Sequence, residues 1–277
     1  MLQLLRHYQQ KKVLNTHALP ESPWQSVLSK PIFMGLNADE RQRLRDRVVW
    51  FLHEKAVFGA GDYQLSDHQK LVIAAQACLP ILNLDIDSYR DWKTVVVYPT
   101  PFVTRDPRPD AIGLVHESAQ VLAGQARHDG PVLLSWPDSR TAPELDGHNV
   151  VIHEFAHKLD MRNGTANGFP PLHKGMRVAD WTQDWKQAYL DFCRRIDQGE
   201  PMPIDAYAAT NPAEFFAVFS EVFFEIPEII ATLYPAVYRQ LVLFYRQDPA
   251  TRLPRQWYPP AEMPPDVTYR PDQAIAW

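Results

Sequence analysis

Residues 149–164 read Asn-Val-Val-Ile-His-Glu-Phe-Ala-His-Lys-Leu-Asp-Met-Arg-Asn-Gly, and the rest of the chain is organised around this stretch. It contains His153, Glu154 and His157 in the His-Glu-x-x-His pattern that is typical of zinc hydrolases. On an α-helix, positions four residues apart lie on the same face, so both imidazoles can reach one ion. Glu154 can reach a metal-bound water without ligating the metal. The pattern predicts a metal-binding helix that carries a general base.

The residues around the motif also favour a helix. Asn149 is a plausible N-cap, and Gly164 is a plausible stop. Val151, Phe155 and Leu159 recur every four residues, and this apolar stripe is offset from the two histidines. One face can therefore pack while the other holds a metal. The alternative is a core helix with two incidental, hydrogen-bonded histidines.

Composition indicates an ordinary globular protein. The 277 residues are 45% hydrophobic and 22% charged, and the formal net charge of −5 gives no reason to expect binding to nucleic acid or to a membrane surface. Cys78 and Cys193 are the only cysteines and cannot form a disulfide framework, which favours a reducing compartment. The N-terminus does not resemble a signal peptide, and no apolar run approaches the roughly 18 residues that span a membrane. We expect a cytoplasmic protein.

The pattern of elements predicts an α+β fold that is mostly helical, with a small mixed β-sheet packed on the metal-binding helix. Capping boxes start helices at Asn37 and Ser66. β-branched runs predict strands at 93–98 and 132–136, with shorter strands between residues 111 and 127. The prolines that bound these strands favour sheet edges. Further helices are expected at 181–198, from Pro212, and at 234–247. We expect an N-terminal helical region at 1–90, a catalytic domain at 91–252 and a Pro-rich tail at 253–277.

A catalytic zinc needs three protein ligands and a position for water. Glu214 is the candidate third ligand, because a carboxylate in a helix crowded with phenylalanines needs a partner or a metal. A solvent-facing glutamate is the alternative. Glu221 and Asp160 are candidates for hydrogen bonding to a zinc-bound histidine, although surface or capping roles suit them equally. Tyr207 could donate a hydrogen bond to a developing oxyanion, and its alternative role is packing.

Several segments resemble the Mlc titration factor A family of bacteria. They cover most of residues 90–252 in order and are far more specific than the five-residue motif; the first ninety residues and the tail resemble the family less. The segments are 130–138 (Gly-Pro-Val-Leu-Leu-Ser-Trp-Pro-Asp), 151–164, 204–209 (Ile-Asp-Ala-Tyr-Ala-Ala), 211–218 (Asn-Pro-Ala-Glu-Phe-Phe-Ala-Val) and 244–249 (Phe-Tyr-Arg-Gln-Asp-Pro).

The resemblance implies a cytosolic zinc metallopeptidase with aminopeptidase-like activity and a zincin-like fold related to the catalytic domain of anthrax lethal factor. It implies that His153, His157 and Glu214 bind one zinc ion per chain. Glu154 would be the general base and Tyr207 the oxyanion helper. The substrate would be a peptide.

The resemblance also implies a further histidine near the metal, and His116 falls at that place. A fourth protein ligand would fill the water position, so zinc binding by His116 would make the resting enzyme self-inhibited. A histidine in a loop or at a strand end is the alternative. His148, which has no matched role, is expected on the approach to the site.

The resemblance finally implies a protein partner, the glucose repressor Mlc. A binding protein that sequesters a transcriptional repressor, with zinc in a structural role, is therefore the alternative to a peptidase. Hydrolysis of a non-peptide amide is a third possibility. Changing Glu154 to alanine would separate the first two, since it should abolish hydrolysis and leave partner binding intact.

Overall fold

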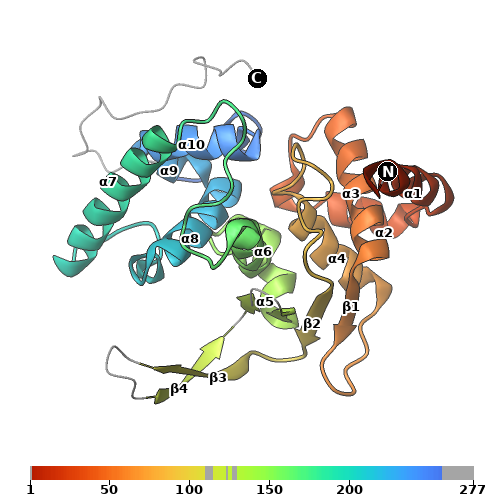
Figure 1. Ribbon diagram of the computed structural model, residues 1–277, viewed down its shortest axis with the longest axis horizontal. Coiled ribbons are helices and arrows are strands. Elements are labelled where there is room, and N and C mark those ends of the chain that lie inside the picture. The colour runs from red at the N-terminus through yellow and green to blue at the C-terminus, as the bar shows by residue number, and fades with distance from the viewer. Residues whose placement is uncertain (1, 110–114, 123, 127–129, 258–277) are drawn as a thin grey trace.

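The computed structural model describes residues 2–109, 115–122, 124–126 and 130–257, and it describes side chains from residue 5 onward except those of 102–123 (Figure 1). The chain folds into helices around a small sheet, as the sequence predicts. The N-terminal elements are α1 (Leu2–Thr16), α2 (Glu21–Leu28), α3 (Ala38–Glu54), β1 (Ala56–Gly59) and α4 (Asp67–Cys78). The central elements are β2 (Thr94–Tyr98), β3 (Phe102–Pro109), β4 (Val115–Leu122), β5 (Gly124–Ala126), β6 (Val132–Ser135), α5 (Trp136–Thr141) and α6 (Val150–Asp160). The C-terminal elements are α7 (Val178–Asp197), the short 3₁₀ helix η4 (Ala206–Ala209), α8 (Pro212–Glu225), α9 (Pro227–Leu233) and α10 (Pro235–Tyr245).

Helix α6 carries the His-Glu-x-x-His motif and lies in the middle of the molecule. In Figure 1 the helices α1–α4 lie on one side of it and α7–α10 on the other. The β3–β4 hairpin lies at the lower edge of the same view. None of the helices within the described residues is both long and apolar enough to cross a membrane. The central position of α6 allows both helical groups to support the motif.

The main sheet is mixed, as predicted, with the strand order β1-β2-β6-β5. β1, β2 and β6 are parallel, and β5 runs antiparallel to β6. The expectation that the proline-bounded strands are edges is wrong, because β2 and β6 are the two inner strands. Pro99 and Pro131 lie just outside the paired residues, so neither removes a ladder hydrogen bond. The edges are β1, where the sequence predicted no strand, and β5.

The capping signals in the sequence were accurate. The Asn37 side chain accepts a hydrogen bond from the Glu40 amide, and the Glu40 carboxylate accepts one from the Asn37 amide. Ser66 and Gln69 form the same reciprocal box at α4. These local pairs satisfy amides that the first helical turn leaves without partners, which is why they are readable from sequence alone. The division of the chain at residue 90 stays a prediction, and β1 and β2 pair across it.

An aromatic core holds α8 in place behind the motif helix. Trp181 and Trp185 of α7 stack with ring centroids 4.8 Å apart, and Phe216 of α8 lies 5.6 Å from Trp185. Phe244 of α10 closes the cluster at 5.9 Å from Phe216. Burying these rings contributes roughly 1.5–3 kcal/mol for each side chain. The apolar side of α8 is thereby fixed toward α7 and α10, which turns its carboxylates toward α6.

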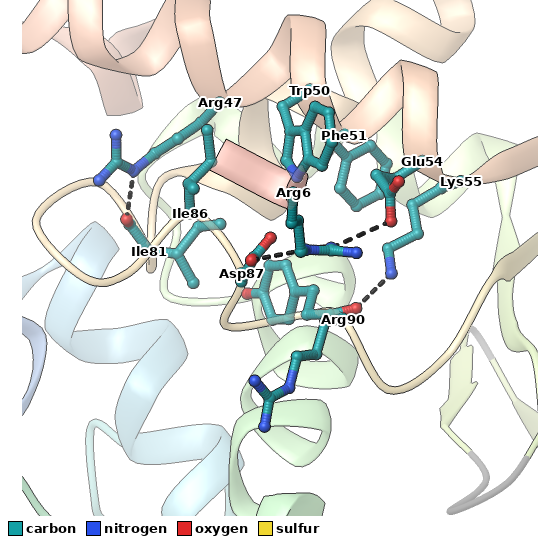
Figure 2. A pocket seen from close by; sticks show the side chains of 11 residues that line it. Arg6, Arg47, Trp50, Phe51, Glu54, Lys55, Ile81, Ile86, Asp87 and Arg90 are labelled. Carbon is teal, nitrogen blue, oxygen red and sulfur yellow. Dashed lines mark hydrogen bonds and ion pairs between the residues drawn. The ribbon is translucent and has the colours of Figure 1, made fainter. Parts of the chain in front are cut away.

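Polar contacts fasten α1 to the body of the protein (Figure 2). Arg6 lies between two carboxylates, with its Nε 2.6 Å from Asp87 and its Nη2 3.2 Å from Glu54. Its guanidinium also lies over the Trp50 ring, 5.4 Å from the centroid. These groups are only partly exposed, so their pairing is worth more than that of a fully solvated surface ion pair.

Lys55 is buried at the end of α3. Its ammonium donates hydrogen bonds to the backbone oxygens of Tyr89 and Trp92 and lies 4.1 Å from the centroid of the Trp92 ring. Burial nevertheless lowers the pKa of Lys55 to about 7, because the low-dielectric surroundings disfavour the charged form. The titration of Lys55 is therefore linked to folding.

Replacing Lys55 by methionine is expected to flatten the dependence of stability on pH above pH 7. Between about pH 7 and 10.5 the unfolded chain keeps the Lys55 proton that the folded protein has lost. The free energy of unfolding should therefore rise with pH across this window, by at most about 1.4 kcal/mol per pH unit. Urea unfolding at several pH values measures the slope. Lys11→Met, on an exposed position of α1, is the control, and an undiminished slope in Lys55→Met contradicts the prediction.

Candidate metal centre

Helices α6 and α8 bring three of the predicted ligands together. The nearest ligand atoms of His153, His157 and Glu214 all lie within 4.8 Å of one another. The Nε2 atoms of His153 and His157 are 3.2 Å apart, and Glu214 Oε2 lies 3.1 Å and 3.2 Å from them. Four-coordinate zinc with nitrogen and oxygen ligands at about 2.0–2.1 Å places those ligands about 3.3 Å apart. The residues therefore fit a tetrahedral ion with one position left for water.

Glu221 lies behind His153, as the sequence suggested. Its Oε1 is 2.7 Å from His153 Nδ1, the ring nitrogen that faces away from the ligand cluster. Its Oε2 accepts a hydrogen bond from the Asn149 amide at 2.5 Å. The Asn149 side chain caps α6 through the Ile152 amide and donates to the buried carboxylate of Glu225 at 2.9 Å. One polar network thus fixes the start of α6 and the orientation of its first histidine.

Asp160 hydrogen-bonds to backbone amides and not to a histidine. Its Oδ2 accepts hydrogen bonds from the amides of Asn167 and Gly168, at 2.8 Å and 2.7 Å. Asp160 Oδ1 and His157 Nδ1 are both buried, and neither has a hydrogen-bond partner among the described residues. Asp160 therefore fixes the loop that follows α6. Among the described residues, a carboxylate contacts the Nδ1 atom of His153 but none contacts that of His157.

The electrostatics of the cluster favour a positive charge on His153 and a negative charge on Glu214. Burial disfavours the charged form of His153, but the Glu221 charge and hydrogen bonds to Glu214 and Glu221 outweigh it and raise the pKa of His153 well above 6.5. Burial acts against Glu214 as well, but hydrogen bonds to His153 and His157 hold the pKa of its carboxyl well below its usual range. Without an ion, the cluster therefore holds a carboxylate against protonated imidazole, and a cation can replace that proton.

Glu154 lies beside the ligand cluster and is almost completely shielded from solvent. Its side chain is on the pocket side of α6, only 4% of the residue is exposed, and its Oε2 has no hydrogen-bond partner among the described residues. Burial raises the pKa of Glu154 to about 7, while the two histidines oppose this shift. A carboxylate in this state is suited to accept and release a proton near neutral pH.

Tyr207 and His116 were the remaining predicted site residues. Tyr207 lies on η4, with its ring centroid 6.1 Å from that of His153, and it lines the same cavity as Glu154. His116 lies on β4, paired with Arg108, but its side chain is outside the part of the chain whose side chains the structure describes. Ligation by His116 stays a prediction.

Two cavities adjoin the ligand cluster. The first, of about 390 Å³, contains His153, Glu154 and Tyr207 in its lining. Further residues that line this cavity are Asp138, Asp146, His148, Asp205 and Gly124. The sequence assigned none of them a role in the site, and only His148 was expected near it. His148 was expected on the approach to the site, and its Nδ1 lies 3.9 Å from Asp205 Oδ2 in this wall. The first cavity is therefore strongly acidic.

The second cavity, of about 420 Å³, is lined by His157 and Glu214 and is less charged. Asn167, Met161 and Ala126 complete much of its wall. Edge strand β5 joins the two cavities, because Gly124 at its start lines the first and Ala126 at its end lines the second. Within the described residues β5 is an edge strand, and an edge that runs past the cluster suits an extended peptide.

Together these features define an α+β protein in which two histidines and a glutamate could hold a metal ion, next to the buried Glu154 and the edge strand β5. The chain belongs to the family described as glucose-regulated metallo-peptidase M90, whose model matches residues 5–246. It is 43% identical over 236 residues to Mlc titration factor A from Salmonella gallinarum, covering 83% of this chain and 88% of that protein. It is 40% identical over 244 residues to Mlc titration factor A from Cronobacter sakazakii, covering 87% and 92%. The resemblance seen in the sequence is confirmed.

Proposed function

We propose that the protein is a zinc-dependent peptidase that binds one zinc ion per chain through His153, His157 and Glu214. The observation that carries this proposal is the spacing of the three ligand atoms, 3.1–3.2 Å, which matches a tetrahedral site with one open position. Membership in a metallopeptidase family supports it. A zinc ion at this site would act as a Lewis acid and would make a water molecule acidic enough to lose its proton near pH 7.

In this proposal the residues of the chain handle the protons and the developing charge. Glu154 accepts the proton of the attacking water on its unpartnered Oε2 and returns it to the amine that leaves. Tyr207, which lines the same cavity, donates a hydrogen bond to the oxygen of the attacked carbonyl as negative charge develops there. The backbone edge of β5 aligns the peptide across the site.

The acidic cavity supports an aminopeptidase-like preference. Three aspartates line it in addition to Glu154 and Glu221, and none of the lining residues that the structure describes is a lysine or an arginine. Asp146 Oδ1 accepts a hydrogen bond from the His148 amide, and Asp205 Oδ1 accepts one from the Tyr207 amide. Asp138 Oδ2 is buried without a partner among the described residues. A free ammonium group at the start of a peptide would satisfy it.

Asp138→Asn is expected to raise KM about tenfold for peptides with a free amino terminus, because a hydrogen bond between charged groups contributes about 1.5 kcal/mol or more. The kcat should change little, since Asp138 is not part of the ligand cluster. Initial rates with one peptide sequence, free and N-acetylated, measure the effect. The acetylated peptide is the matched control, and an equal rise of KM for both forms would exclude recognition of the ammonium by Asp138.

The names of the relatives favour a second function. Proteins 40–43% identical to this chain are called Mlc titration factor A, so we also propose that the chain binds a repressor of the Mlc type. If repressor binding were the sole function, zinc would be structural and Glu154 would not be needed for that function. The proposed partners are thus a peptide and a repressor, with no direct binding to nucleic acid.

Metal analysis combined with turnover tests the main proposal. The purified protein should contain one zinc per chain, and a panel of aminoacyl and internally quenched peptides should include substrates whose hydrolysis stops on chelation and returns with zinc. One zinc without turnover of any peptide would favour the repressor-binding function or silencing by His116. Absence of zinc from protein expressed with zinc available would overturn the assignment of the site.

A further inference from the structure

Strand β5 contacts helix α6, which carries Glu154, at Gly124. A Cβ atom placed on Gly124 would lie 2.5 Å from Oε1 of Glu154, 2.6 Å from its Cγ and 2.7 Å from Cγ2 of Val150. Cβ atoms essentially never approach another heavy atom within 3.0 Å. Val150 and Glu154 are four residues apart on α6, so they form one stripe of the helix and the strand crosses that stripe at Gly124.

We propose that Gly124 is a positioning residue for Glu154: its missing side chain leaves the space in which the carboxylate of the base is held beside the metal centre. This inference rests on the proposed peptidase function for its kinetic consequence. The contact itself is independent of that function. Nothing in the His-Glu-x-x-His motif indicates it, since Gly124 lies 30 residues before Glu154 in the chain.

Space, and not backbone torsion, makes glycine necessary here. Gly124 is absent from the described glycines with positive φ, so an alanine could adopt its backbone conformation. The close approach of a strand to a helix is the other circumstance that requires glycine. The methyl group of an alanine would overlap the side chain of Glu154 and a methyl group of Val150, so at least one of these groups must move.

The strand is held more firmly than the side chain. β5 pairs with β6 at three positions, Gly124 with Leu134, Gln125 with Leu133 and Ala126 with Val132. Leu134 and Val132 are fully buried, so moving β5 outward would break its ladder and open the core. Glu154 has three rotatable side-chain bonds and lines a cavity. An added methyl group is therefore expected to displace the Glu154 carboxylate into that cavity.

Gly124→Ala is expected to lower kcat about a hundredfold, the cost of misplacing a catalytic group by about 1 Å. KM should stay within about twofold and the zinc content should stay at the wild-type value, because neither the ligands nor the strand edge changes. Glu200→Ala, at a surface position beside Arg194 and Arg195, is the control and should keep wild-type kcat. A wild-type kcat in Gly124→Ala overturns the proposal, and so does a loss confined to KM.

A thermal-unfolding cycle on metal-free protein tests the contact without any measurement of activity. Gly124→Ala should lower Tm in the wild-type background by clearly more than in the Glu154→Ala background, where the carboxylate that it meets is absent. Equal shifts in both backgrounds overturn the proposal. If Gly124→Ala does not fold, the double variant Gly124→Ala/Glu154→Ala should fold, and its failure to do so overturns the proposal by assigning the restriction to Val150.

The two tests separate the inference from the proposed function. If the wild-type protein hydrolyses no peptide, the peptidase proposal fails, while the unfolding cycle still decides whether Gly124 and Glu154 are coupled. If the protein is a peptidase but the Tm shifts are additive and Gly124→Ala retains its kcat, the peptidase proposal stands and the role of Gly124 fails. A crystal structure of Gly124→Ala should show the Glu154 carboxylate in a different rotamer.

Discussion

Glu154→Gln is expected to reduce kcat by about a hundredfold to ten-thousandfold, the usual contribution of a general base, while the protein retains one zinc per chain. The amide keeps the shape of the side chain in its nearly closed position but cannot accept a proton from water. Metal should be retained because Glu154 is not one of the three residues whose ligand atoms cluster. Peptide hydrolysis and metal content measured on the same preparations give both quantities.

The control for this experiment is Glu144→Gln, because Glu144 has a half-exposed side chain and pairs with Lys30 on the surface. It should leave kcat and zinc content at wild-type values. Turnover by Glu154→Gln at the wild-type rate would remove Glu154 from the mechanism. Binding of a Mlc-type repressor that survives in Glu154→Gln would show that the two proposed functions are separable, as the sequence analysis anticipated.

Sequence alone was sufficient for the features that depend on neighbours within one helix. The capping residues Asn37 and Ser66 act on amides three positions away, so their effect is visible in a few letters of sequence. The spacing of His153 and His157 likewise needs only the geometry of one helix. Glu214 could be chosen because a carboxylate among phenylalanines is unusual. The structure brings it to the two histidines, although 57 residues separate it from His157.

The features that sequence did not indicate depend on the sheet. β5 falls where the sequence predicted a short strand, but only the folded structure shows that Gly124 lies against Glu154. Asp138 reaches the acidic cavity because α5 begins directly after β6. The prolines beside β2 and β6 were misleading for a related reason. They mark the ends of strands, and the position of a strand within a sheet is set by pairing with distant residues.

The two carboxylates proposed to support histidines show the same limit. Glu221 and Asp160 were equivalent candidates from sequence, since Glu221 lies two turns after the candidate ligand Glu214 and Asp160 lies just after the motif. Glu221 meets His153 because α8 packs across α6, whereas Asp160 follows His157 on the same helix and is drawn to the amides of Asn167 and Gly168. Tertiary packing therefore decided between two locally similar residues.

This arrangement leads to a graded prediction for metal affinity. Glu221→Ala should weaken zinc binding about 10–100-fold, the usual effect of removing a carboxylate that orients a ligating histidine. Glu214→Ala should weaken it further, because a ligand itself is lost and two imidazoles remain. Asp160→Ala should affect zinc binding less than Glu221→Ala, since its hydrogen bonds go to loop amides. Competition with a chelator of known affinity ranks the three variants.

Thermal or urea unfolding with added zinc provides an independent measure of the same order. At a zinc concentration 100 times the wild-type Kd, binding should stabilise the wild-type protein by about 2.7 kcal/mol. A variant that binds 100-fold more weakly should gain only about 0.4 kcal/mol at that concentration. Glu200→Ala, on the surface beside Arg194 and Arg195, is the control and should keep the full gain. If Glu214→Ala keeps it too, Glu214 is not a ligand, and the site must draw its third ligand from elsewhere in the chain.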